Sequence, residues 1–216
     1  MKREVDYGVY LVTDRPLCGD RPLEEVVLAA VCGGATVVQL REKDCTTRAF
    51  VELAAALVIR LRPVGVPLII NDRVDVALAA GADGVHVGQS DMPSAKARRL
   101  MGPEAIVGLS VETPEQATDA EDLDCDYLGV SPIFSTPTKT DTYAEWGLAG
   151  LRALRARSRH KLVAIGGLHP GNATEVVVAG ADGIAVVSAI CAAEDPEAAA
   201  RALRRIVDAG RRGAGD

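Results

Sequence analysis

The stretch Ala80-Gly81-Ala82-Asp83-Gly84-Val85 recurs near the end of the chain as Ala179-Gly180-Ala181-Asp182-Gly183-Ile184. Each copy leads into a short apolar run, and in the order of such runs these are the fourth and the eighth predicted strands. Those positions lie half a barrel apart, so the repeat favours a closed eight-stranded barrel. We interpret Asp83 and Asp182, each beside a glycine, as turn formers on the face of the barrel that carries stability.

Short β-branched runs alternate with Ala/Leu-rich segments along the whole chain. The runs are nearly continuous in hydrophobicity, as expected for parallel strands that are covered on both faces. The predicted strands are Val9–Val12, Val37–Leu40, Leu68–Ile70, Gly84–Val87, Ile106–Leu109, Tyr127–Val130, Leu162–Ile165 and Ile184–Val187. The predicted helices include Arg48–Leu61, Val74–Ala80, one capped by Thr113 with Pro114 at its first position, and Pro196–Val207.

This alternation predicts a single-domain α/β protein, a (β/α)8 TIM barrel that spans residues 1–216. The length is a little below the ~250 residues typical of that fold. An open doubly wound sheet is the main alternative, but no G-x-G-x-x-G follows the first predicted strand, where a dinucleotide-binding sheet would carry it. We expect residues 210–216, a polar Gly/Arg segment, to form a frayed tail.

Composition excludes several classes of function. With 24 Lys+Arg against 30 Asp+Glu and 3% aromatics, the chain suits neither a DNA-coating protein nor a stacking platform for single strands. No segment approaches the ~18 apolar residues that cross a bilayer, and acids stand where a signal peptide would be apolar. The five cysteines form no C-x-x-C pair. We therefore expect a cytoplasmic protein with free thiols that binds neither nucleic acid nor membrane.

Polar residues follow the predicted strands at the end where barrel enzymes carry their chemistry. After the second strand, alternation places Gln39, Arg41 and Lys43 on one side, a row of donors that ends in two cations. A guanidinium and an ammonium together suit polyphosphate recognition. A solvated surface loop is the alternative for this charged run when it is taken alone.

Two neighbouring strands each deliver a carboxylate to the same rim. Asp72 follows the third strand and Asp91 follows the fourth, and such a pair suits Mg²⁺, which is completed by water and substrate phosphates. Either aspartate alone would more often be a helix cap. His86 is expected to face the barrel interior, as a structural or a catalytic histidine.

The later strands add hydroxyls, a lysine and glycines. Ser110 ends the fifth strand, and since no base is evident in the sequence we expect it to contact substrate. Lys139 lies in a loop of hydroxyls and prolines that would act as a lid. Gly166-Gly167 and Val187-Ser188 follow the last two strands, where a phosphate site recurs in this fold. The rim thus holds two predicted anion sites.

Taken together, these motifs resemble those of the thiamine-phosphate synthase family over the chain from about Tyr10 to Ile190. The motifs that carry the resemblance are Gln39-Leu40-Arg41-Glu42-Lys43, Asn71-Asp72-Arg73, Gly84-Val85-His86-Val87-Gly88-Gln89 with Asp91, Thr136-Pro137-Thr138-Lys139 and Ala164-Ile165-Gly166-Gly167. Each motif is modest by itself, and their order and spacing make the match specific.

The resemblance implies a transferase that joins a pyrimidine diphosphate to a thiazole phosphate and releases pyrophosphate. It implies a pyrimidine diphosphate site at Gln39, Leu40, Arg41, Glu42, Lys43, Asn71, Ser110 and Lys139. It implies a thiazole phosphate site at Thr136, Pro137, Thr138, Gly167, Val187 and Ser188, and one Mg²⁺ at Asp72 and Asp91. The catalytic residues would be Lys139, Arg41, Lys43 and Ser110.

In such enzymes pyrophosphate leaves before the thiazole nitrogen attacks, so charge placed on the leaving group matters more than a protein nucleophile. A related thiazole tautomerase and a non-catalytic regulator that binds thiazole phosphate are the alternatives. The tautomerase should not need the full set of cations and carboxylates. The regulator predicts ligand binding without turnover, and nothing in the sequence shows loss of a required group. The partners implied are the two small-molecule substrates, with a homo-oligomer left open.

Overall fold

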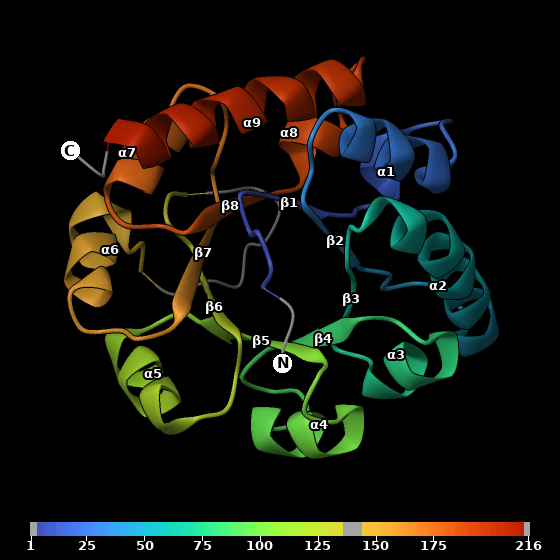
Figure 1. Cartoon of the computed structure of the whole chain (residues 1–216), viewed down its shortest axis with the longest axis horizontal. Coiled ribbons are helices and arrows are strands. Elements are labelled where there is room, and N and C mark those ends of the chain that lie inside the picture. Colours follow the sequence, from blue (N-terminus) through green and yellow to red (C-terminus); the bar gives the residue numbers. More distant parts are fainter. Residues whose placement is uncertain (1–3, 136–143, 214–216) are drawn as a thin grey trace.

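The computed structural model describes residues 4–135 and 144–213. Within these residues eight parallel strands close a barrel in chain order, each hydrogen-bonded to the next and β8 to β1. Figure 1 looks down the barrel, with the strands inside a ring of helices. The strands are β1 (Val9–Val12), β2 (Val37–Leu40), β3 (Leu68–Asn71), β4 (Gly84–Val87), β5 (Ile106–Val111), β6 (Tyr127–Val130), β7 (Lys161–Ile165) and β8 (Gly183–Val186). The predicted (β/α)8 barrel is confirmed, and the open sheet is wrong.

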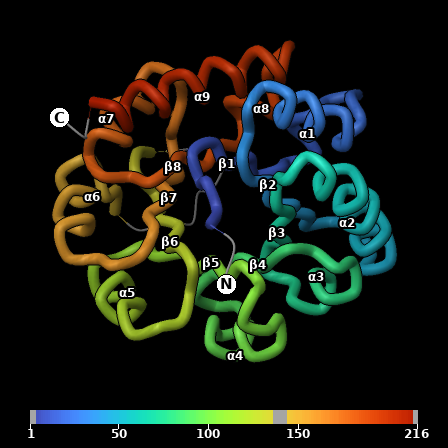
Figure 2. Tube along the Cα trace, in the orientation of Figure 1, coloured from blue at the N-terminus to red at the C-terminus, as the bar shows by residue number. Residues whose placement is uncertain are grey.

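The helices lie outside the strands and follow them around the barrel, as the continuous trace in Figure 2 shows. They are α1 (Leu23–Cys32), α2 (Thr47–Leu61), α3 (Val74–Ala80), α4 (Ser94–Met101), α5 (Pro114–Asp119), α6 (Gly147–Arg155), α7 (Ala173–Val178), α8 (Ser188–Cys191) and α9 (Pro196–Gly213). Short 3-10 turns lie at η1 (Pro16–Cys18), η2 (Arg62–Val64) and η3 (Ala120–Asp122). As predicted, Thr113 caps α5, accepting from the backbone N–H of Gln116 at 3.3 Å.

Two apolar layers hold the fold together. The larger lies between the strands and the helices, because alternate side chains of each strand point outward and meet the apolar stripes of the helices. The smaller fills the barrel itself and consists of Tyr7, Tyr10, Val12, Val37, Ile69, Ile106, Tyr127, Val163 and Ala185. Barrel interiors are usually filled by branched aliphatic residues. Here the tyrosines add hydroxyls to that interior, so part of it is polar.

Aspartates at the amino ends of the strands stabilise the closed sheet. Asp83 accepts from the backbone N–H of Leu68 at 2.9 Å, and Asp182 accepts from that of Leu162 at 2.9 Å. Asp182 also pairs with Lys161 at 3.0 Å. Both aspartates therefore serve the stability face, as the repeated sequence predicts.

Residues 210–213 differ from the predicted frayed tail, and residues 214–216 lie outside the residues that the structure describes. Instead of fraying at Gly210, α9 continues through Gly213. Gly210 is buried, and a Cβ there would lie 3.0 Å from side-chain atoms of Val177 in α7. Arg211 pairs with Asp6 at 2.9 Å and donates to the backbone of Asp182. Residues 210–213 are helical because Gly210 allows close packing on α7 and Arg211 is held by Asp6 and the Asp182 carbonyl.

All five cysteines are free: Cys18, Cys125 and Cys191 are buried, and Cys32 and Cys45 are exposed. In residues 4–135 and 144–213, no helix combines the length and the apolar character needed to cross a membrane.

Candidate functional site

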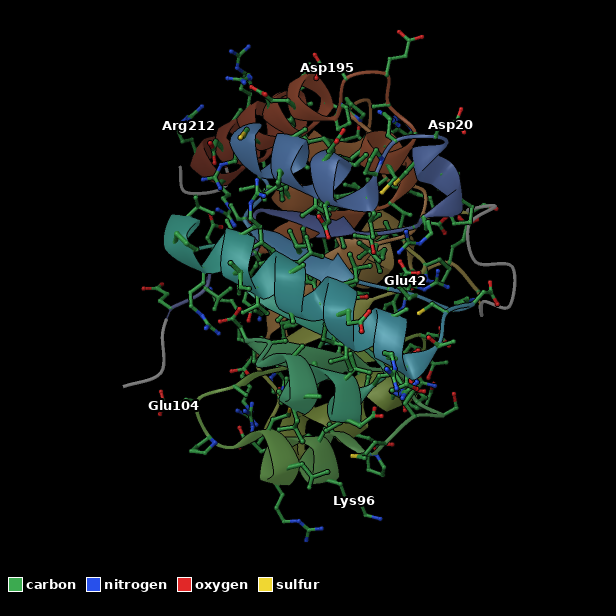
Figure 3. The ribbon with its side chains drawn as sticks, turned by 90° about the vertical axis from the view of Figure 1, so that its right-hand side faces the viewer. Asp20, Glu42, Lys96, Glu104, Asp195 and Arg212 are labelled. Carbon is green, nitrogen blue, oxygen red and sulfur yellow. The ribbon has the colours of Figure 1, made fainter. Side chains whose placement is uncertain are left out.

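A cavity of about 1150 Å³ opens at the carboxyl ends of the strands. In Figure 3, Glu42, which follows β2, lies toward the same end of the barrel as Asp20, whereas Glu104 and Arg212 lie toward the opposite end. The cavity is lined by the predicted site residues Gln39, Arg41, Lys43, Asn71, Asp72, Asp91, Ser110, Gly167, Val187 and Ser188. Both predicted anion sites therefore open into one space, which β2–β5 line on one side and β7 and β8 on the other.

The segment after β2 divides its side chains between two environments. Gln39, Arg41 and Lys43 line the cavity, as alternation predicts. Leu40 is fully buried between the strands and the helices, and Glu42 forms an ion pair with Arg15 at 3.0 Å. The side chains of Leu40 and Glu42 therefore do not line the cavity, because the pleat turns them away from it, and the part of these two residues in the substrate site stays a prediction.

Arg41 is held at the rim by contacts on both of its ends. Its backbone N–H donates to Thr13 Oγ1 at 2.9 Å, and its guanidinium lies 3.7 Å from the Asp14 carboxylate. At that distance the ion pair is weak, so the guanidinium keeps donors for an anion in the cavity. Arg41 is thus positioned by β1 and remains able to bind a ligand.

Asp72 and Asp91 meet at the rim between β3 and β4. Burial raises the pKa of Asp72 above its usual value, and a hydrogen bond and charge repulsion from Asp91 raise it further, against smaller effects of Asn71 and Arg41. Asp72 has φ 62°, a left-handed conformation that non-glycine residues rarely adopt. Asp91 accepts from the backbone N–H of Gly88 at 2.8 Å. A strained, crowded carboxylate pair of this kind would be relieved by a cation.

The donor set fits Mg²⁺. Mg²⁺ is usually bound by one or two carboxylates, with water and substrate phosphates completing its shell. In the part of the chain that the structure describes, no cluster of three or more His, Cys, Asp or Glu residues could enclose a metal. Asp72 and Asp91 supply two carboxylates, which suits an ion that a phosphorylated ligand shares.

A line of hydrogen bonds, which we call the interior chain, runs behind the cavity. Gln39 Nε2 donates to Tyr10 Oη at 2.9 Å, and the hydroxyls of Tyr10 and Tyr127 are 2.7 Å apart. Tyr127 Oη lies 2.8 Å from His86 Nδ1, and His86 Nε2 lies 2.8 Å from Ser110 Oγ. His86 faces the barrel interior, as predicted. Sequence reasoning found no partner for Ser110, whereas the structure supplies His86.

Across the cavity, β7 and β8 present small residues. Gly166 and Gly167 have φ values of 101° and 66°. A Cβ on Gly167 would lie 2.7 Å from the backbone oxygen of Ser135, so a side chain does not fit there. Ser188 begins α8 and adds a hydroxyl. These features suit a small anion that is held by backbone and hydroxyl donors.

Sequence reasoning missed several lining residues. Tyr10 and Tyr127 form the cavity floor, and Glu112 and His169 line its wall. The two tyrosines occupy inward positions of β1 and β6, and this could have identified them. Nothing in the local pattern singles out Glu112 or His169. The predicted residues Thr136, Pro137, Thr138 and Lys139 lie outside the residues that the structure describes.

Comparisons with known proteins show which family the chain belongs to. The family described as thiamine monophosphate synthase matches residues 9–190. The thiamine-phosphate synthase of Albidiferax ferrireducens is 61% identical, covering 93% of this chain and 92% of that relative. The thiamine-phosphate synthase of Leptospira biflexa serovar Patoc is 56% identical, covering 91% and 96%.

Solved structures give the same result. Thiamine phosphate pyrophosphorylase from Pyrococcus furiosus superposes with a TM-score of 0.87 at 40% identity, covering 95% of this chain and 98% of that one. A 3-hexulose-6-phosphate synthase, at 18% identity with a TM-score of 0.67, covering 92% and 99%, shares the barrel fold alone. At these identities and over nearly the whole length, the chain belongs to the thiamine monophosphate synthase family and is a transferase.

Proposed function

We propose that this enzyme joins a 4-amino-2-methylpyrimidine, carried as its methyl diphosphate ester, to a thiazole phosphate. Thiamine phosphate and pyrophosphate would be the products. The proposal rests on one observation: Arg41 and Lys43, the Asp72–Asp91 pair and the Gly167–Ser188 side open into the same cavity. One wall thus suits a diphosphate with a metal ion, and the opposite wall suits a monophosphate. An enzyme that couples two phosphorylated substrates needs both.

The protein groups suit a reaction in which the leaving group departs first. When bound at Asp72 and Asp91, Mg²⁺ would neutralise charge on the diphosphate. Arg41 and Lys43 would hold the departing pyrophosphate, because fixed cations stabilise charge as it develops. The thiazole nitrogen would then attack the pyrimidinyl-methyl cation, which the ring amino group stabilises. By the family resemblance, Lys139 would add a third cation to the leaving group.

No protein nucleophile is needed in this scheme. Ser110 is hydrogen-bonded to His86, but the far side of that histidine meets the neutral hydroxyl of Tyr127. A serine nucleophile usually relies on a carboxylate there, which stabilises the imidazolium. Burial raises the pKa of Tyr127 well above its usual value, so its phenol stays neutral. Ser110 is therefore better suited to contact substrate.

The direct test is incubation of the purified chain with both substrates and Mg²⁺, followed by detection of thiamine phosphate and pyrophosphate. We expect both products in equal amounts, and neither when either substrate or Mg²⁺ is omitted. A proton shift in the thiazole without coupling would instead indicate a tautomerase. Binding of thiazole phosphate without turnover would indicate a regulator.

The proposed metal site has its own test in Asp91→Asn. This change removes a charge and keeps an oxygen that can still accept from the Gly88 N–H. We expect half-maximal activity to require at least about tenfold more Mg²⁺, since loss of a carboxylate ligand weakens a site of this kind. Asp83→Asn, on the opposite face, is the matched control and should leave the Mg²⁺ titration unchanged. An unaltered titration in Asp91→Asn would remove this residue from the metal site.

A further inference from the structure

The interior chain occupies space that two glycines leave open. His86 is paired in register with Gly108 on β5, and Ser110 with Gly129 on β6. Because neither glycine has a side chain, the rings of His86 and Tyr127 lie over them and stack, with centroids 5.4 Å apart. The interior chain is therefore a line of hydrogen-bonded polar side chains inside a largely apolar barrel. Packing alone does not explain why polar groups lie there.

We assign one direction to the chain. The Gln39 amide nitrogen donates to Tyr10 Oη. Either phenol can be the donor in the Tyr10–Tyr127 bond, and the roles at His86 depend on its tautomer, so we take each hydroxyl that accepts from one neighbour to donate to the next: Tyr10 to Tyr127 Oη, and Tyr127 to His86 Nδ1. Burial raises the pKa of both phenols, so both keep their protons. A neutral imidazole that accepts at Nδ1 carries its proton on Nε2.

His86 Nε2–H then donates to Ser110 Oγ. With its oxygen engaged as an acceptor, the serine hydroxyl has its own proton left to give. Gln89 also donates to the Ser110 carbonyl at 2.6 Å, which fixes the end of β5. The Ser110 side chain lines the cavity, so its proton is directed toward a bound ligand.

We infer that Tyr127 and His86, with Tyr10 behind them, are positioning residues that make Ser110 an obligatory hydrogen-bond donor to the pyrimidine diphosphate. The inference rests on the proposed function for the identity of the ligand. It opposes the reading in which His86 accepts the Ser110 proton as a base. That reading reverses the three bonds from Tyr10 to Ser110 and places the imidazole proton on Nδ1. The two readings therefore differ in one observable, the tautomer of His86.

The kinetic test uses Tyr127→Phe, which removes the hydroxyl and keeps the ring. We expect kcat/KM for the pyrimidine diphosphate to fall about three- to tenfold, as for the loss of one oriented hydrogen bond, with KM for the thiazole phosphate unchanged. In a Ser110→Ala background the same change should have no further effect, because the two residues act as a unit. Tyr7→Phe is the matched control, since the Tyr7 ring packs at a tilt against Tyr127, with centroids 4.9 Å apart, and Tyr7 is not a member of the interior chain.

The spectroscopic test needs no substrate. The protein has three histidines, so ¹⁵N-labelled histidine gives few ring signals, and loss of one set in His86→Gln assigns them. In the neutral protein we expect His86 Nδ1 to be unprotonated and Nε2 to be protonated. Tyr127→Phe should increase the Nδ1-protonated form. Tyr10→Phe gives a second variant where Tyr127→Phe does not fold.

Two results would overturn the inference. One is a proton on His86 Nδ1 in the wild-type protein, and the other is a fall in kcat/KM on Tyr127→Phe that is equally large in the Ser110→Ala background. A wild-type enzyme that couples no substrates would refute the proposed function instead. The ¹⁵N signals of His86 would still report its tautomer and hence the direction of the hydrogen bonds. Failure of the proposed function can therefore be distinguished from failure of this inference.

Discussion

Replacing Gly108 with alanine tests whether the barrel interior is built around the interior chain. A Cβ at this position would lie 2.2 Å from Tyr127 Cζ, 2.4 Å from its hydroxyl and 2.5 Å from His86 Nδ1, where ordinary contacts begin at 3.4 Å. Tyr127 has little room to retreat, because Tyr10 stands against its hydroxyl at 2.7 Å. The added methyl therefore has to displace the ring and its hydrogen bonds.

The expected cost combines two effects. Overpacking a core by one methyl group costs about 1–3 kcal/mol. Breaking one or two buried hydrogen bonds adds about 1 kcal/mol each. We expect Gly108→Ala to lower the free energy of unfolding by about 2–5 kcal/mol. At Gly129 the nearest atom is His86 Cε1 at 3.0 Å and the next are at 3.5 Å and beyond, so Gly129→Ala should cost less than about 1 kcal/mol.

Urea denaturation of the wild type and of both variants measures this difference in the free energy of unfolding. The midpoint should shift while the dependence of the unfolding free energy on urea concentration stays constant. The comparison is informative because both glycines lie on strands and neither has a positive φ, so backbone strain does not distinguish them. Equal stability of the two variants would refute the reasoning. So would a stable Gly108→Ala with a normal KM for the pyrimidine diphosphate, since the chain would then tolerate displacement.

Three further predictions concern stability and the phosphate site. Arg98→Ala should lower the free energy of unfolding by about 3–5 kcal/mol, because it removes the guanidinium that pairs with the partly buried Asp126 carboxylate at 2.6 Å, and Arg98→Lys should lower it less; equal midpoints in urea would contradict this. Burial raises the pKa of Asp6, but hydrogen bonds from two arginines and a backbone N–H outweigh burial and lower the pKa overall. The ionised Asp6 carboxylate therefore stabilises the fold above its unfolded pKa of about 3.9. This stabilisation is lost as the pH falls through the lower pKa of the folded state. The difference in urea denaturation midpoint between the wild type and Asp6→Asn should therefore become smaller below about pH 4. Ser188→Ala should raise KM for the thiazole phosphate about two- to tenfold with the pyrimidine diphosphate unaffected, and the reverse pattern in steady-state kinetics would place the phosphate site wrongly.

Much of the site could be predicted from the sequence because two regular patterns govern it. The pleat alternates side chains, which brought Gln39, Arg41 and Lys43 to one side. Parallel strands end at one rim, which brought Asp72 and Asp91 together from separate loops. Neither inference needs a long-range contact beyond the order of the strands.

The parts that sequence reasoning missed depend on contacts between distant residues. Tyr10 and Tyr127 are 117 positions apart, and the stagger of a closed barrel decides which side chains meet inside it. Polar composition made residues 210–213 look frayed, because the close approach of Gly210 to Val177 is a tertiary feature. Leu40 and Glu42 were predicted from a resemblance by motif, and a motif does not separate a side chain that lines the cavity from its neighbour in the pleat.

The carboxylates at the two ends of this barrel differ in whether the protein itself neutralises their charge. On the stability face, Asp182 accepts from a backbone N–H and pairs with Lys161, so its charge is neutralised within the protein. At the cavity, Asp72 and Asp91 lie against each other, and in the described part of the chain neither forms an ion pair with lysine or arginine. Bringing like charges together costs stability unless a cation joins them. We propose that a cation bound together with a diphosphate supplies this positive charge at the cavity, as the proposed Mg²⁺ at Asp72 and Asp91 would.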